Sequence, residues 1–258
     1  MYKRQCGAGR VGFTIAKLLI EAGLPNGVFN IINGDKNIVE AICNHKGIKA
    51  LTFVGSTKVA KIVYRTATAS LKRCIALGGA KNHLILLPDA HEDMAANDII
   101  NSMSGCAGQR CMAASAMVAV GDTESIIEKI CEKASTVIPG KNLGAIISKE
   151  SKKRIEKYIS DAEKAGAKIL VDGRGVIVEG KEDGYYVGPT VIDHVKPDMA
   201  IAKEEVFGPV LVIIRTNDID DAIAIENSSN YGNASSVYTQ NGNLSDYVTE
   251  RVSAGMVG

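Results

Sequence analysis

The stretch IKALTFVGSTKVAK, residues 48–61, decides the fold that the sequence predicts. Its first half, IKALTFVG (48–55), has the apolar and β-branched composition of a buried strand. Gly55-Ser56-Thr57 ends that strand, and a helix follows from Lys58. A second strand, CIAL (74–77), comes after the helix and ends at Gly78-Gly79. Strands separated by helices of this length are typical of βαβ units and a parallel sheet, so we expect an α/β fold.

The same alternation extends along the rest of the chain. Apolar periodicity predicts helices over residues 13–22, 37–45, 92–106, 123–137, 149–165 and 218–229. It predicts strands over residues 28–32, 83–87, 117–121, 168–173, 175–180, 185–195, 210–215 and 235–239, with those from 168 to 195 as an antiparallel group. The regular βα rhythm changes near residues 78–82, which divides the chain into an expected domain over 1–78 and a second over 79–258.

Composition excludes several classes of protein. The chain has 258 residues, 46% hydrophobic and 23% charged, which suits a globular protein with a real core. A formal net charge of +1 favours neither nucleic acid nor an anionic membrane as a partner. No apolar run reaches the ~20 residues that span a bilayer. The opening MYKRQCGAGRVG lacks the apolar segment of a secretory signal.

Cysteine and histidine spacing predicts neither disulfides nor a metal site. Of six cysteines only Cys106 and Cys111 lie close together, and there is no CxxC. The four histidines are scattered without zinc-ligand spacing. We therefore expect no metal and a reducing compartment, which is the cytoplasm, or the mitochondrial matrix if the source is eukaryotic.

Two glycine-containing segments are candidates for binding phosphate. GAGRVG (7–12) matches G-x-G-x-x-G, but the residues MYKRQC before it are no strand, which favours a chance match that leads into a helix. TFVGSTKVAK (52–61) is better placed, because a strand leads to Gly-Ser at a helix N-terminus. An ordinary Ser or Thr N-cap explains the second segment equally well, so both interpretations stay open.

Two further segments carry side chains suited to chemistry. In GCAGQRCMA (105–113), Cys111 follows a long helix and stands next to Arg110, and a cation and a helix terminus both favour a thiolate. The alternative is that Cys111 is a buried structural cysteine without a catalytic role. KEEVFGPVLVI (203–213) either carries a carboxylate and a ring into a cleft or is a charged turn before a strand. LGGAKNH (77–83) is by itself only a turn.

Taken together, these segments resemble the aldehyde dehydrogenase superfamily. The chain carries AGLPNGVFNIING, TFVGST, LGGAKNH, GCAGQRCMA, LGAIIS, GYYVGPTVI, KEEVFGPVLVI and YGNASSVYT in the family's order. The resemblance runs from about residue 21 to the end of the chain, and the joint order is far more specific than any single motif. It implies an aldehyde dehydrogenase-like α/β fold, with part of a Rossmann-like NAD domain joined to an α/β catalytic domain.

The resemblance also implies roles for particular residues. Cys111 matches the thiolate that attacks the aldehyde, and its backbone N–H matches an oxyanion donor. Phe53, Gly55 and Ser56 match the segment along the NAD pyrophosphate and nicotinamide. Glu205 matches the carboxylate that binds the nicotinamide ribose, and Phe207 matches the ring beside it.

One departure from the family narrows the expected reaction. Hydrolytic members have a glutamate just before Leu-Gly-Gly that activates water, and this chain has Ala76 there. The CoA-acylating methylmalonate-semialdehyde group also lacks that glutamate and shares the GAKNH and GQRCMA strings. Coenzyme A supplies its own thiol, and Arg110 matches an arginine that binds the substrate carboxylate. The alternatives are a hydrolytic enzyme and a non-catalytic remnant.

The resemblance further predicts a truncated protein. The family's upstream half of the NAD domain, the asparagine that completes the oxyanion hole and the C-terminal strand have no counterpart here, and PGKNLGAIIS (139–148) is shorter than in the family. We expect a fragment that is largely inactive by itself, from a parent that is a homodimer or homotetramer acting on a small aldehyde.

Overall fold

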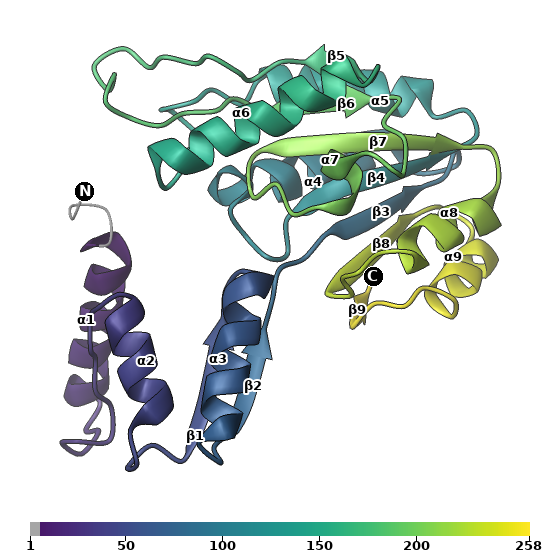
Figure 1. The fold of residues 1–258 in the computed structure, drawn as a ribbon. Helices are drawn as coiled ribbons and strands as arrows, with labels where there is room; N and C mark the ends of the chain where they lie inside the picture. Colours follow the sequence, from purple (N-terminus) through teal and green to yellow (C-terminus); the bar gives the residue numbers. More distant parts are fainter. Residues whose placement is uncertain (1–5) are drawn as a thin grey trace. The chain divides into compact units, whose positions relative to one another are not determined.

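The computed structural model describes residues 6–258 and divides into two compact units. The N-terminal unit is Met1–Gly79, and the C-terminal unit is Ala80–Gly258. Both contain helices between parallel strands, so the α/β class predicted from the sequence is confirmed (Figure 1).

The N-terminal unit is built on a single βαβ crossover. Its elements are helix α1 (Cys6–Glu21), helix α2 (Lys36–Asn44), strand β1 (Ala50–Val54), helix α3 (Thr57–Ala69) and strand β2 (Arg73–Leu77). β1 and β2 pair in parallel, as a crossover of this length requires. The GAGRVG segment lies inside α1, so it forms no loop between a strand and a helix.

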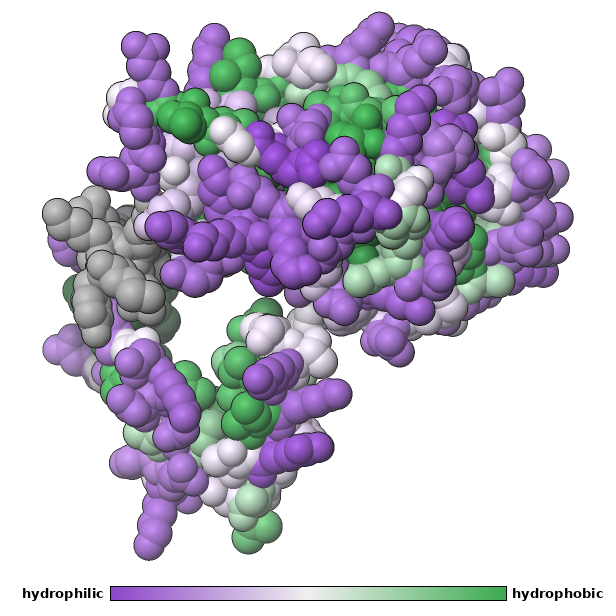
Figure 2. Space-filling view, turned by 45° about the horizontal axis from the view of Figure 1, so that its top comes forward, coloured by the Kyte–Doolittle hydropathy of each residue, from purple (hydrophilic) through white to green (hydrophobic). Residues whose placement is uncertain are grey.

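Only one face of this small sheet is covered by helices. Cys43, Val63 and Ala67 are buried, and alternate side chains of the strands, among them Leu51 and Phe53, pack against them. The opposite face leaves apolar side chains at the surface, since Val54, Ile75 and Leu77 are each more than half exposed. Apolar side chains are visible among the polar ones in Figure 2.

The C-terminal unit contains a seven-stranded sheet in the order β5-β6-β7-β4-β3-β8-β9. Its strands are β3 (Asn82–Leu86), β4 (Ala114–Val120), β5 (Lys168–Val171), β6 (Thr190–Asp193), β7 (Val210–Thr216), β8 (Ala234–Tyr238) and β9 (Met256–Val257). Every neighbouring pair is parallel except β5 with β6. The buried central strands are continuous apolar runs, because a parallel sheet is covered on both faces.

Helices cover both faces of that sheet. They are α4 (Glu92–Ser104), the 3-10 helix η1 (Gly105–Gly108), α5 (Glu124–Ser135), α6 (Lys149–Lys164), α7 (Ala200–Lys203), α8 (Ile219–Asn227) and α9 (Gly242–Thr249). Leu84 and Leu86 of β3 pack with α4 and α5. Ile85, between them in sequence, faces the other way and packs with α8 and α9. A third apolar cluster joins α6 and α7 to β6 and β7.

Two predicted strands are absent, and others are shorter than predicted. Residues 28–32 form no strand because they pair with no other strand in the described part of the chain. Residues 175–180 are a loop, since Gly175 and Gly180 adopt left-handed conformations that end extended chain at both sides. Within 185–195 only Thr190–Asp193 is a strand, and it does pair antiparallel with β5.

Candidate active site

A strained turn carries the chain from α4 to Cys111. Cys106 (φ +53°), Ala107 (φ +55°) and Gly108 (φ +68°) are three consecutive residues in the left-handed region. Left-handed residues other than glycine cost about 1–2 kcal/mol each and persist where surrounding structure holds them. The turn leaves Cys106 and Cys111 both exposed, so neither is a buried structural thiol.

Two asparagine side chains hold the Cys111 peptide in place. Asn82 Nδ2 donates to the Cys111 carbonyl at 2.8 Å and to the Ala113 carbonyl at 2.9 Å. Asn233 Nδ2 donates to the same Cys111 carbonyl at 2.9 Å. The backbone N–H of Cys111 has no hydrogen-bond partner within residues 6–258. The Cys111 carbonyl is therefore fixed by the first residue of β3 and by the residue just before β8, while the N–H stays available.

Neither asparagine was predicted from the sequence as a site residue. Asn82 stands in LGGAKNH and begins β3, and Asn233 stands in YGNASSVYT just before β8. Their shared target, the Cys111 carbonyl, becomes evident only when β3 and β8 pair. The buried Asn82 Oδ1 has no protein partner within the described residues, so this amide retains one unused acceptor.

The Arg110 side chain points to the end of α4. Its Nη2 donates to the Ser102 carbonyl at 2.9 Å and approaches the Asn101 carbonyl at 3.4 Å. Those carbonyls belong to the last turn of the helix, where a cation is favoured. The structure thus gives Arg110 a helix-capping role, and binding of a substrate carboxylate stays a prediction.

The segment Glu205–Gly208 forms the opposite wall of the Cys111 site. Phe207 has φ +56°, the same left-handed strain as the Cys111 turn. Gly108 and Gly208 approach so closely that a Cβ on Gly108 would lie 2.0 Å from the Gly208 carbonyl oxygen. A small pocket in this unit is lined by residues that include Arg110, Cys111, Glu205 and Phe207. The structure therefore brings together these four predicted residues.

Side chains of helix α6 hold that wall in place. Arg154 Nη1 donates to the Val206 carbonyl at 2.8 Å and approaches the Glu205 carbonyl at 3.4 Å. The Tyr158 hydroxyl donates to the Glu204 carboxylate. Ile155 packs where any side chain on residue 208 would stand. These contacts hold the loop through two backbone carbonyls and the Glu204 carboxylate, and helix α6 donates no hydrogen bond to the Glu205 carboxylate.

Burial perturbs two ionisable groups beside the site. Burial raises the pKa of Glu205, opposed by a hydrogen bond from the Ala80 backbone N–H and by the charges of Arg154 and Lys81. Burial lowers the pKa of Lys81 to about 7, and Glu205 opposes that shift. Lys81 Nζ donates to the Ile201 carbonyl at 2.7 Å, which ties the residue before β3 to α7. Perturbed groups of this kind cluster at functional sites.

The other predicted residues lie in the N-terminal unit, at the turn from β1 to α3. Ser56 is the N-cap residue of α3, but its side chain makes no capping hydrogen bond. A helix leaves its first N–H groups without intrahelical partners, so this terminus can accept an anion. The Phe53 ring lies over Gly55, where a Cβ would come within 2.7 Å of it. This geometry favours the phosphate-binding interpretation over an ordinary Ser cap.

Within residues 6–258, no group of three or more His, Cys, Asp or Glu side chains could hold a metal ion. No helix in that range is long and apolar enough to cross a bilayer.

Comparison with known proteins decides the family. The sequence pattern of the aldehyde dehydrogenase family matches residues 3–258. The chain belongs to this family. It is 46% identical over 252 residues to malonate-semialdehyde dehydrogenase 2 of Geobacillus thermodenitrificans, covering 95% of this chain and 52% of that protein. It is 41% identical to the acylating methylmalonate-semialdehyde/malonate-semialdehyde dehydrogenase of Rattus norvegicus, covering 95% of this chain and 47% of that protein.

Solved aldehyde dehydrogenase structures share the fold. A methylmalonate-semialdehyde dehydrogenase from Oceanimonas doudoroffii superposes with a TM-score of 0.91 at 43% identity, covering 95% of this chain and 52% of that one. Betaine aldehyde dehydrogenase from Staphylococcus aureus, solved with NAD+, gives 0.87 at 26% identity, with 95% and 50% covered. The chain thus spans about half the length of the aldehyde dehydrogenases that it matches.

Proposed function

We propose that this chain is the thiol-bearing part of an NAD-dependent, CoA-acylating aldehyde dehydrogenase for malonate or methylmalonate semialdehyde. The Cys111 site carries the proposal, since an exposed thiol stands beside an uncommitted backbone N–H, with Glu205 and Phe207 in the facing wall. The printed names of the relatives at 41–46% identity support the substrate class. The proposed units are a partial NAD-binding domain and a catalytic domain.

Each step of the proposed reaction is assigned to Cys111 or to a bound cosubstrate. The Cys111 thiolate adds to the aldehyde carbon, and the new oxyanion accepts a hydrogen bond from the Cys111 N–H. Bound NAD, with Glu205 and Phe207 beside its nicotinamide ribose, would supply the hydride acceptor, and Cys111 would then carry the acyl group as a thioester. The thiolate of coenzyme A then attacks that thioester, and the bond between the acyl group and Cys111 breaks. The substrate carboxylate leaves as CO2, and a proton takes its place.

The chain's own residues fit NAD in two places. The open N-terminus of α3 with Ser56 suits a pyrophosphate. The half-buried Glu205 carboxylate suits ribose hydroxyls, which donate hydrogen bonds to it. We propose Phe53, Gly55 and Ser56 as contacts from the N-terminal unit, and Glu205 and Phe207 as contacts from the C-terminal unit.

The sequence around the end of β2 favours coenzyme A over water as the acyl acceptor. No residue from Cys74 to Ala80 carries a carboxylate, so no side chain in this stretch can act as a general base for water. A thiolate needs no such base, because it is already a strong nucleophile toward a thioester. A hydrolytic reaction is therefore the less supported alternative.

Acylation of the chain itself tests this proposal without NAD. Incubation with propionyl-CoA is expected to transfer the propionyl group to Cys111, as seen by mass spectrometry of the intact chain and its peptides. Cys111→Ala is expected to abolish the transfer. Cys106→Ala is the matched control, because Cys106 is exposed in the same turn and the neighbouring Ala107 already tolerates a left-handed conformation.

The acylated protein then distinguishes coenzyme A from water as the acyl acceptor. After removal of excess reagent, coenzyme A is expected to deacylate Cys111 at least 100-fold faster than buffer alone. Labelling at Cys106 instead of Cys111 would overturn the assignment of the nucleophile. Deacylation by water as fast as by coenzyme A would favour the hydrolytic alternative.

NAD binding tests how much function the chain retains. With about half of the length of its relatives present, we expect weak or undetectable NAD binding by calorimetry. Micromolar affinity, or NAD reduction by the chain with methylmalonate semialdehyde and coenzyme A, would contradict the view of a largely idle fragment.

A further inference from the structure

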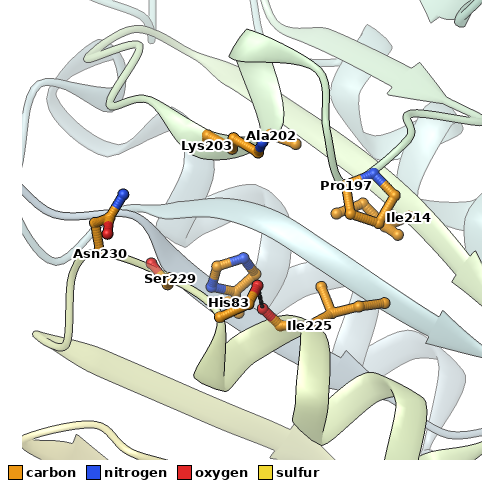
Figure 3. A pocket seen from close by; sticks show the side chains of 9 residues that line it. His83, Pro197, Ala202, Lys203, Ile214, Ile225, Ser229 and Asn230 are labelled. Carbon is orange, nitrogen blue, oxygen red and sulfur yellow. Dashed lines mark hydrogen bonds between the residues drawn. The ribbon is translucent and has the colours of Figure 1, made fainter.

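A second cavity in the C-terminal unit has a polar end and an apolar end. It encloses about 190 Å³ and is lined by His83, Pro197, Ala202, Lys203, Ile214, Ile225, Ser228, Ser229 and Asn230. Figure 3 shows His83, Ser229 and Asn230 toward one end, Pro197 and Ile214 at the other, and Lys203 across from His83. None of these residues lines the pocket at Cys111.

The polar end offers hydrogen-bond donors that no protein group uses. Ser229 Oγ accepts from the Tyr231 backbone N–H at 3.2 Å, so its hydroxyl hydrogen is available. Asn230 and Lys203 are exposed, and neither the Asn230 amide nor the Lys203 ammonium makes a hydrogen bond within residues 6–258. His83 is 96% buried, and its Nδ1 makes no hydrogen bond of normal geometry there, although the ring lies near the Lys81 carbonyl.

The charges of the residues that line the cavity favour an anionic ligand. Lys203 is the one charged residue among the nine that line the cavity, and no carboxylate is present among them. The buried Lys81, whose pKa burial lowers to about 7, lies outside the lining but close enough to lower the pKa of His83. An anionic head group would therefore meet one ammonium and several neutral donors, without a like charge in the lining.

We propose that this cavity binds a short-chain aliphatic monocarboxylate, with its carboxylate toward Lys203, Ser229 and Asn230 and its alkyl chain toward Pro197, Ile214 and Ile225. The apolar end disfavours a fully hydrated inorganic anion, because such an ion would lose water there without gaining contacts. His83, which lines this cavity, follows directly after Asn82, which lines the pocket at Cys111.

Propionate is the probe for this proposal. Titration of the full chain, labelled with 15N in its histidine side chains, is expected to shift the His83 ring signals with a dissociation constant of about 1 mM, a reasonable affinity for so small a ligand. Loss of the signal in His83→Gln assigns it. Neutral propionamide is expected to bind at least tenfold more weakly. Inorganic phosphate is expected to give no saturable shift.

Two variants of the lining make the test specific. Lys203→Gln removes an exposed charge without touching the core and is expected to weaken propionate binding about fivefold to tenfold. Lys153→Gln removes the same charge from the exposed face of α6 and is expected to leave binding unchanged. Ile225→Phe fills the apolar end and is expected to abolish binding while circular dichroism stays that of the parent.

Several results would overturn the proposal. They are no saturable shift at 20-fold the expected constant, about 20 mM propionate, equal weakening by Lys203→Gln and Lys153→Gln, or phosphate binding as tight as propionate. None of these results depends on the reaction proposed for Cys111. The binding experiments therefore test the cavity independently of the proposed function.

Discussion

The two units bury their apolar residues to very different extents. In the C-terminal unit three apolar clusters cover both faces of the sheet. In the N-terminal unit the buried cluster is Cys43, Val63 and Ala67. Of the large apolar side chains exposed in the described residues, 15 lie in Met1–Gly79 and 7 in Ala80–Gly258, although the second unit is more than twice as long.

This difference shows that correct secondary structure does not by itself make a unit stable. The βαβ crossover of the N-terminal unit has correct local signals, yet two strands and a few helices bury little surface. The C-terminal unit has enough buried area for a cooperative core. We therefore expect the C-terminal unit to dominate the free energy of unfolding of the chain, and the N-terminal unit to open at much lower free energy.

The largest expected effect comes from matched truncations of isoleucine in the two sheets. Ile85→Ala removes a fully buried side chain from β3 and is expected to cost about 4 kcal/mol of unfolding free energy in urea denaturation. Ile75→Ala, on the open face of β2 where the side chain is 61% exposed, is expected to cost less than about 0.5 kcal/mol. Equal costs would show that the N-terminal sheet is covered in solution.

Acid pH is expected to weaken the C-terminal unit through His83. Burial, helped by the charge of Lys81, lowers the pKa of His83 to about 4 from an ordinary value of 6.5. Between these values the unfolded chain binds a proton that the folded chain does not, so stability falls as pH decreases from 6.5 to 4. The shift corresponds to about 3 kcal/mol.

The measurement is urea unfolding at pH 7 and pH 4.5 for the chain and for His83→Gln. The variant is expected to lose less stability than the parent over this interval, since only the parent carries the buried imidazole. Identical losses would assign the acid sensitivity to other groups.

Sequence alone predicted what depends on local pattern. The TFVGST turn and the βα alternation followed from residue order. The candidate roles of Cys111, Glu205 and Phe207 came from the resemblance, and the structure places these three residues in one pocket. Strand pairing was harder to predict. Residues 28–32 are apolar enough for a strand, but a strand also requires a hydrogen-bonded neighbour, which no local pattern specifies.

Long-range side-chain contacts also escaped prediction. Asn233 reaches the Cys111 carbonyl from a residue 122 positions away in sequence. The Arg110 side chain returns to α4 because the left-handed turn at Cys106 and Ala107 reverses the chain, and that geometry is not evident from the residues themselves. Helix α9 carries a single buried residue, Val248, so apolar periodicity gave little signal for it.

Two left-handed glycines test how tightly the Cys111 turn is packed. Gly108→Ala and Gly121→Ala impose the same backbone strain, with φ +68° and +65°. A Cβ on Gly121 meets only Pro88 at 3.4 Å, whereas one on Gly108 meets the Gly208 carbonyl at 2.0 Å. Gly108→Ala is therefore expected to cost about 2 kcal/mol more than Gly121→Ala in urea unfolding.

The same substitution should move the facing loop. Gly108→Ala is expected to increase amide hydrogen exchange at residues 206–208 and to change the rate of iodoacetamide alkylation at Cys111, whereas Gly121→Ala alters neither. A cost equal to that of Gly121→Ala would mean that the two loops separate easily and that the pocket is not held by this contact.

The smallest expected effect is a gain of stability in the N-terminal unit. Leu71 follows α3 with φ +54°, and its backbone N–H donates to the Thr68 carbonyl while that of Lys72 donates to the Ala67 carbonyl. This Schellman arrangement favours glycine at the position of Leu71. The Leu71 side chain is 96% exposed, so Leu71→Gly loses almost no packing. Relief of the left-handed strain is expected to stabilise α3 by about 1 kcal/mol.

Amide hydrogen exchange locates that gain. Leu71→Gly is expected to raise protection in α3 about fivefold, which corresponds to about 1 kcal/mol, because opening of the N-terminal unit controls exchange there. Protection in β3 and β4 should stay constant, since those strands open with the C-terminal core. If protection rises equally in β4, the two units unfold together. The N-terminal unit would then not open at a lower free energy than the C-terminal unit, even though their packing differs.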